Sequence, residues 1–173
     1  MNSVSTNTKE TGNAYAPSED RWNAVIRRDR NADAKFYYDV LDPASQRPWP
    51  PTPEIVRRLA ERAAVQAGFM SFQPDSCLIN RYEPGAQLSL HQDRNERDFG
   101  QPIVSLSLGL PAIFLFGGQL RNERPPRMRR ESGDVVVWGG ASRLAFHGVA
   151  PLADGHHPLT GHCRINLTLR KAL

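Results

Sequence analysis

The sequence lacks long apolar runs, has no cysteine pair with metal-binding spacing, and contains little lysine. No apolar run approaches the roughly 20 residues of a membrane-spanning helix, so we expect no membrane span. Residues 1–18 lack the apolar centre of a secretory signal, which predicts a cytoplasmic protein. The two cysteines, Cys77 and Cys163, have no metal-binding spacing, so we expect buried thiols rather than a zinc site or a disulfide.

Lysine is scarce as well, because arginine outnumbers it 19 to 3 in a chain of net charge +4 and pI about 9.4. The arginines gather in two clusters, within residues 27–30 and within residues 121–130. Guanidinium groups suit phosphates, which favours nucleic-acid binding. An arginine-rich solvated surface explains the same composition, so charge alone leaves both interpretations open.

The 173 residues suffice for one domain with a substantial core. Residues 1–20 are polar and indicate disorder, and an ordered pattern begins with an expected strand at residues 36–40. We therefore divide the chain into a divergent N-terminal segment, 1–35, and a domain, 36–173.

The pattern within the domain predicts an α+β fold that is mainly β. Apolar residues at helical spacing predict a helix around residues 54–67, with Thr52 as N-cap and Pro53 in the first turn. After it, short alternating runs separated by Gly and Pro are typical of an antiparallel sandwich or roll. The expected strands cover residues 76–82, 87–92, 103–109, 113–116, 134–138, 143–148 and 163–170.

Two of these expected strands carry a polar face, because side chains alternate along a strand. Arg164, Asn166 and Arg170 share a face of the last strand, and Asn80 shares a face with Tyr82. Either these faces meet solvent, or their polar groups point inward toward a partner. Asn is depleted in strands, which makes the second interpretation worth pursuing.

His91, Asp93 and His147 are candidate metal ligands. His91 and Asp93 lie two residues apart in an expected strand and so share a face. This HxD pair is a weak motif alone, but His147 ends another expected strand. Two imidazoles and one carboxylate form a facial triad with open positions, which suits Fe(II) with O₂ and a co-substrate. Arg164, further along the chain, suits a dicarboxylate co-substrate because arginine binds carboxylates bidentately.

Several motifs, in the right order over residues 36–173, closely resemble the AlkB family of nucleic-acid demethylases, in particular the bacterial AlkB proteins. They are CLINRYEPGA at 77–86, LSLHQD at 88–93, PIVSLSLGLP at 102–111, GDVVVWGG at 133–140, Arg143-Leu144 with His147-Gly148, and Cys163-Arg164 with Asn166-Leu167-Thr168 and Arg170.

The resemblance implies a double-stranded β-helix (jelly-roll) core that uses Fe(II), 2-oxoglutarate and O₂. Position by position, His91, Asp93 and His147 match the iron ligands, and Arg164 matches the arginine that pairs with 2-oxoglutarate. The other matched residues are Asn80, Tyr82, Asn166 and Arg170 in the cofactor pocket, and Phe36, Tyr38, Asn95, Arg121 and Trp138 around the substrate.

The activity that the resemblance implies is DNA repair by oxidative demethylation of N-alkylated bases, such as 1-methyladenine and 3-methylcytosine. Methyl hydroxylation would be coupled to 2-oxoglutarate decarboxylation and followed by formaldehyde release. The implied partner is alkylated DNA, preferably single-stranded, or RNA. The implied enzyme is a monomer without a membrane partner.

The sequence departs from the family at two places. Asn95 stands where the family has an acidic residue near the base, and an amide donates hydrogen bonds as well as accepting them. Residues 28–33 also lack the tryptophan of the family's nucleotide-recognition lid. Two alternatives therefore stay open: a 2-oxoglutarate oxygenase with another substrate, RNA or protein, and an inactive truncated nucleic-acid-binding fragment.

Overall fold

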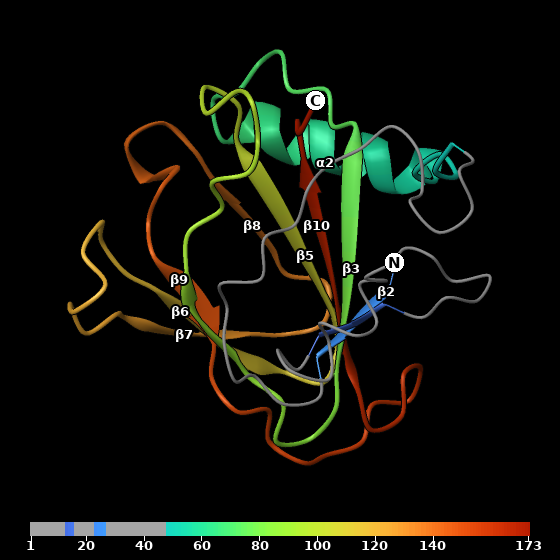
Figure 1. Cartoon of the computed structure of the whole chain (residues 1–173). Coiled ribbons are helices and arrows are strands. Elements are labelled where there is room, and N and C mark those ends of the chain that lie inside the picture. The colour runs from blue at the N-terminus through green and yellow to red at the C-terminus, as the bar shows by residue number, and fades with distance from the viewer. Residues whose placement is uncertain (1–12, 16–22, 27–47) are drawn as a thin grey trace, which may run out of the picture.

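Two facing β-sheets and one long helix make up the part of the chain that the computed structural model describes, which is residues 13–15, 23–26 and 48–173 (Figure 1). None of the helices in these residues has the length and apolar character needed to cross a membrane. The predicted strand at 36–40 and the predicted boundary at residue 35 lie outside the described residues.

The larger sheet has the order β1-β2-β3-β10-β5-β8, and the smaller sheet has the order β4-β9-β6-β7. All neighbouring pairs are antiparallel except β2 and β3, which run parallel. This arrangement confirms the predicted mainly β jelly-roll. The strands of the larger sheet are β1 (Asn13–Tyr15), β2 (Asn23–Ile26), β3 (Ser76–Tyr82), β10 (Arg164–Arg170), β5 (Ile103–Gly109) and β8 (Val135–Trp138); those of the smaller are β4 (Leu88–His91), β9 (His147–Val149), β6 (Ala112–Phe116) and β7 (Arg127–Arg130).

Helix α2 (Glu54–Gln66) packs on the outer face of the larger sheet. Its contact residues Ala60 and Ala64 are fully buried, because their small side chains let the helix approach the apolar face of the larger sheet, closest at β5 and β8. That face supplies Leu167 and Leu169. The helix confirms the predicted one, and it leaves the opposite face of the sheet free to carry polar groups.

The predicted N-cap of this helix was wrong. Pro53 is the N-cap residue, its backbone is extended rather than helical, and its carbonyl accepts hydrogen bonds from the amides of Val56 and Arg57. Thr52 therefore lies one residue too early to cap the first turn. The negative charge of Glu54 in the first turn instead interacts favourably with the positive end of the helix dipole. Glu54 also forms an ion pair with Arg57.

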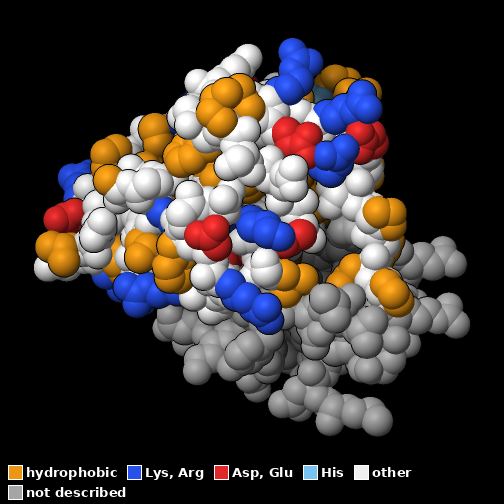
Figure 2. Space-filling view, turned by 90° about the horizontal axis from the view of Figure 1, so that it is seen from above, with side chains coloured by type: hydrophobic (Ala, Val, Ile, Leu, Met, Phe, Trp, Pro, Cys, Tyr) orange, Lys and Arg blue, Asp and Glu red, His pale blue; other side chains and the backbone are white. Residues whose placement is uncertain are grey.

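The end of the molecule that carries α2 has a mixed-charge surface. In Figure 2, which views the molecule from above Figure 1, acidic and basic side chains lie next to one another. The ion pairs of α2 are of this kind, since Glu54 contacts both Arg57 and Arg58. Because positive and negative charges alternate on this face, it does not form the continuous basic surface that attracts phosphates.

Two further expectations about strands need correction. Strand β7 was not predicted, because its sequence Arg-Met-Arg-Arg has an exposed, charged face and little β-propensity. The strand predicted over residues 143–148 begins only at His147. A short 3-10 helix, η1 (Gly140–Ser142), precedes it, and Ala145 still donates to the carbonyl of Ser142 in a turn.

Candidate metal centre

Strand pairing brings the two predicted imidazoles together. In the smaller sheet β4 pairs with β9 so that His91 lies opposite His147, and their ring centroids are 4.4 Å apart. Gly148 makes this close pairing feasible, because a Cβ at that position would lie 2.5 Å from the carbonyl oxygen of Leu88. A glycine is therefore required directly after His147 for β9 to lie this close to β4.

Both rings are oriented by backbone carbonyls. Nδ1 of His91 is 2.9 Å from the carbonyl oxygen of Ser89, and Nδ1 of His147 is 3.0 Å from that of Ala145. A carbonyl only accepts hydrogen bonds, so each Nδ1 carries the proton and each Nε2 presents a lone pair. Such a contact at the second nitrogen is the usual way in which a protein fixes a metal-binding histidine.

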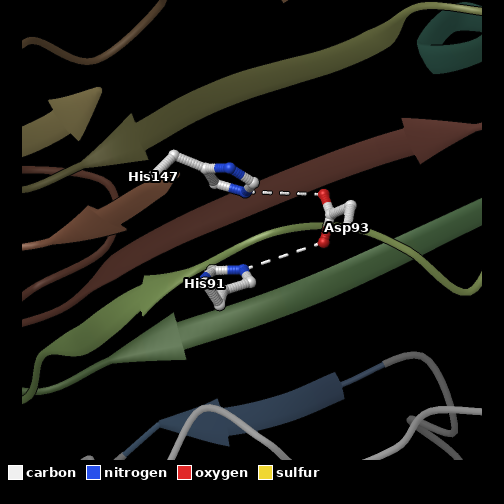
Figure 3. A group of neighbouring side chains, drawn as sticks. All are labelled: His91, Asp93 and His147. Atoms are coloured by element: carbon white, nitrogen blue, oxygen red, sulfur yellow. Dashed lines mark ion pairs between the residues drawn. The ribbon is translucent and has the colours of Figure 1, made fainter. Parts of the chain in front are cut away.

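Asp93 completes the group, although it lies in the loop after β4 rather than in a strand (Figure 3). Its Oδ1 is 3.7 Å from Nε2 of His91, and its Oδ2 is 3.5 Å from Nε2 of His147. One ligand atom from each residue lies within 4.8 Å of the other two. Ligands at about 2.0–2.2 Å from a metal sit roughly 3 Å apart in adjacent positions, so a small contraction would seat an ion.

The charges at this site also suit a cation. Burial raises the pKa of Asp93, but the attraction of Arg170 and the two imidazoles outweighs it and holds this pKa well below its usual range. Burial, and then the neighbouring His147, lowers the pKa of His91 to about 4. Asp93 is therefore ionised and His91 neutral at physiological pH, which are the forms that bind metal. The donor set fits Fe(II).

The pocket around these residues lies between the two sheets. Its walls come mainly from the inner faces of β3, β4, β8, β9 and β10 and from the loop after β4. The lining residues are Leu78, Asn80, Tyr82, Leu88, His91, Gln92, Asp93, Arg94, Asn95, Glu96, Ser105, Phe114, Trp138, His147, Gly148, Val149, Asn166, Thr168 and Arg170. The polar faces of β3 and β10 thus point inward.

The solvent interpretation of the last strand was therefore wrong. Strand β10 is flanked on both sides, by β3 and β5, and the polar side chains of its inner face are all buried. Asn166 accepts a hydrogen bond from Ser105 and donates one to Thr168, so it is fixed within this face. Asn80 lies opposite Asn166 in the register of β3 and β10 and is buried as well.

Arg164 is a buried cation that is only partly satisfied. Its Nη2 donates to Ser107 at 2.8 Å and to Asn166 at 3.1 Å, while its Nε and Nη1 have no hydrogen-bond partner within the described residues. Its guanidinium lies 5.3 Å from the ring centre of Tyr82. Burial lowers its pKa, which is the cost of holding a charge out of water. A carboxylate that accepted a hydrogen bond from Nε or Nη1 would give this cation a counter-charge, so the donor set also fits 2-oxoglutarate.

The residues predicted near a substrate fall into three groups. Trp138 and Asn95 line the pocket, and the Trp138 ring lies 5.1 Å from that of His147. Arg121 is exposed in the loop between β6 and β7 and does not line this pocket. Phe36 and Tyr38 lie outside the described residues.

Sequence reasoning missed several residues of the site. Ser105 and Ser107 on β5 hold Asn166 and Arg164, and two serines at alternate positions of an apolar strand were a signal of an inward polar face. Glu96 and Arg143 are buried beside Asp93. No local pattern distinguishes these two from surface charges. The two cysteines are free thiols, as predicted, but only Cys163 is buried, because Cys77 is partly exposed.

Comparisons with known proteins agree with the geometry. A family model described as the 2OG-Fe(II) oxygenase superfamily matches residues 5–170. The alpha-ketoglutarate-dependent dioxygenase AlkB of Escherichia coli (strain K12) is 58% identical over 137 residues, which cover 79% of this chain and 63% of that protein. The tRNA demethylase abh1 of Schizosaccharomyces pombe is 41% identical over 97 residues, which cover 54% of this chain and 32% of that protein.

A solved structure, that of OsALKBH1, resembles the chain with a TM-score of 0.71 and 28% sequence identity, covering 93% of this chain and 75% of that one. These similarities confirm the predicted resemblance and fold. The chain spans about 63% of the length of the AlkB relative.

Proposed function

Because the chain belongs to the 2OG-Fe(II) oxygenase superfamily, we propose that it is an Fe(II)- and 2-oxoglutarate-dependent dioxygenase that demethylates N-alkylated bases in nucleic acid. The observation that carries this proposal is that Arg164, whose Nε and Nη1 have no hydrogen-bond partner within the described residues, contacts Asn166, which lines the same pocket as the His91–Asp93–His147 group.

The residues divide into metal ligands and co-substrate ligands. His91 and His147 would hold Fe(II) through Nε2, and Asp93 through its carboxylate. Arg164 would pair with one carboxylate of 2-oxoglutarate, with polar contacts from Asn80, Tyr82, Asn166 and Arg170. When bound, this centre supplies oxidation by O₂ coupled to decarboxylation of 2-oxoglutarate to succinate. Once hydroxylated, the methyl group would leave as formaldehyde with release of the hydroxyl proton, and the ring nitrogen would keep the electron pair of the broken C–N bond.

The substrate we propose is a methylated base in a single strand. The relatives' names include a tRNA demethylase and a nucleic acid dioxygenase, that of Homo sapiens. The pocket lies between two sheets, so a base must leave its stack to reach it, at a cost of a few kcal/mol that a single strand reduces. Trp138 and His91 offer flat faces to a base, and Asn95 offers an amide. Exposed Arg94 and Arg121 suit the phosphates.

We extend the proposal to a monomer that acts in the cytoplasm. Elution as a single species of about 19.4 kDa in size-exclusion chromatography would support the first part. Fractionation of cells that express the chain would test the second.

Incubation with methylated oligonucleotides tests the activity. Single-stranded DNA and RNA of one sequence, each with 1-methyladenine or 3-methylcytosine, are incubated with Fe(II), 2-oxoglutarate and O₂. We expect equal amounts of succinate and formaldehyde, and the base preference will show what Asn95 selects. Asp93→Asn should abolish both products, whereas Asp98→Asn, an exposed residue of the same loop, should not. Neither product from a folded, metal-loaded chain would refute the proposal.

A second candidate is a 2-oxoglutarate oxygenase that acts on another substrate. The amide of Asn95 in the pocket wall favours it, because a carboxylate and an amide select different hydrogen-bonding partners. This candidate would be supported if the chain released succinate but none of the oligonucleotides yielded formaldehyde.

A further inference from the structure

Asp93 differs from the other two metal ligands in the way its backbone is held. His91 and His147 face each other across a strand pair, so the hydrogen bonds of the smaller sheet fix their spacing. Strand β4 ends at His91 and β5 begins only at Ile103, so Asp93 lies in an irregular loop, residues 92–102. No strand pairing fixes the third ligand. Some other contact must therefore set its position.

The Arg143 side chain supplies three contacts to that loop. Its Nη1 donates to the backbone carbonyl of Asp93, its Nε to the carbonyl of Gln101, and its Nη2 to Oε2 of Glu96, each at 3.0 Å. It also lies against the ring of Phe99, 5.3 Å from the ring centre. One guanidinium thus holds both ends and the middle of the loop.

Arg143 reaches the loop from the segment that carries His147. It directly follows η1 and lies four positions before His147 in the sequence. A second hydrogen bond joins the same segments, from Nε2 of Gln92 to the carbonyl of Leu144. These contacts therefore hold the loop that contains Asp93 against the segment that leads to His147. Strand pairing does not connect these two segments.

The contact is a buried ion pair with balanced charge. The side chains of Arg143 and Glu96 are 3% and 1% exposed, so water solvates neither charge and each depends on the other. Glu96 also lies 3.5 Å from Nε of Arg170, whose Nη2 donates to Asp93 at 2.8 Å. Two cations and two carboxylates thus form one group. Buried ion pairs add little stability compared with apolar packing, so a role in fixing geometry explains this one better.

We propose that Arg143, with Glu96 as its counter-charge, is a positioning residue for the metal centre. It holds the backbone of Asp93 against the segment that carries His147 before any ion binds, whereas Arg170 contacts the Asp93 carboxylate itself. The inference rests on the proposed function in that it takes His91, Asp93 and His147 as the ligands. The predicted consequence is a metal affinity that depends on a side chain which does not touch the metal.

Arg143→Lys tests this, because lysine keeps the charge but cannot make three directed contacts. The metal-free protein is titrated calorimetrically with Mn(II), and backbone amide exchange of residues 92–101 is measured without metal. We expect about a 10–100-fold weaker Mn(II) affinity, as for other residues that orient metal ligands, and faster exchange in the loop. Arg129→Lys is the matched control, because Arg129 pairs with Glu131 on the surface. Neither measurement should change in it.

Glu96→Gln is the second variant and serves if Arg143→Lys does not fold. It keeps the size of the side chain and removes the charge, so we expect the same two changes to a smaller extent. Unchanged affinity and unchanged exchange in the variants that fold would overturn the proposal. Wild-type protein that binds no Mn(II) would refute the proposed metal site, whereas the exchange data would still decide whether Arg143 holds the loop.

Discussion

At the scale of single residues, Arg164 makes the sharpest prediction, because this buried guanidinium has two nitrogens without a hydrogen-bond partner among the described residues and therefore suits an anion. We expect Arg164→Met to weaken 2-oxoglutarate binding by about 2–5 kcal/mol, which is at least roughly thirtyfold in Kd. Titration of the Mn(II)-loaded protein with 2-oxoglutarate measures this. Mn(II) affinity should stay at the wild-type value, since Arg164 is not a ligand.

The same variant separates a binding role from a structural one. Replacing a partly satisfied buried cation with an apolar side chain removes a desolvation cost, so the free energy of unfolding should not fall. Urea unfolding of the metal-free protein measures it, with Arg129→Met as the exposed control. A loss of several kcal/mol would show that Arg164 mainly supports the fold.

Cys77 gives a prediction about pH. Burial raises the pKa of its thiol to about 11 from an ordinary value of 9.0. At pH 8 the thiolate should thus be about a hundredfold scarcer than in an unperturbed cysteine, with proportionally slower alkylation by iodoacetamide. The rate should rise about tenfold per pH unit up to pH 11, as measured by mass spectrometry of the Cys77 peptide.

The sign for stability follows from the same shift. Between about pH 9 and 11 the folded chain holds the Cys77 proton and the unfolded chain has released it. This contribution to stability is therefore complete below pH 9 and is lost as the pH rises. Alkylation in urea that is as slow as in the folded protein would contradict the role of burial.

At the scale of elements, β10 separates the core from the site. Leu169 on its outer face is fully buried against α2, while its inner face carries Thr168 and Arg170 into the pocket. We expect Leu169→Ala to lower the free energy of unfolding by about 2–5 kcal/mol in urea, with unchanged Mn(II) affinity. Ile55→Ala, on the exposed face of α2, should change it by less than about 0.5 kcal/mol.

The elements also show how far local pattern reaches. The sequence pattern located β3 and β5 to the residue, although β5 is buried on both faces almost throughout and burial alternates only at the end of β3. Strand β7 escaped detection because an edge strand of arginines has no apolar face of its own. The segment before His147 was assigned to a strand because its residues alternate. In the structure Arg143 instead turns inward to meet a loop some 50 residues earlier.

At the scale of the whole molecule, the site lies between two sheets, so metal binding should stabilise the fold. Mn(II) at about 100 times its Kd should add about 2.7 kcal/mol, or roughly 5–10 °C in Tm, to the EDTA-treated protein. 2-Oxoglutarate should raise Tm further only when metal is present. Differential scanning fluorimetry measures both. A similar Mn(II) response in His147→Ala would place the ion elsewhere.

The sequence by itself determined the strand alternation, the helix, the His91–Asp93–His147 set and the arginine beyond it. Side-chain periodicity and donor chemistry are local properties, which made these residues candidates, but the pairing of β4 with β9 that brings His147 to His91 is not local. Only the tertiary structure decided that the polar face of β10 lies inside, because that depends on which strands flank it. It alone joined Arg143 and Glu96 to Asp93, since a contact between distant segments depends on how the sheets bring the chain together.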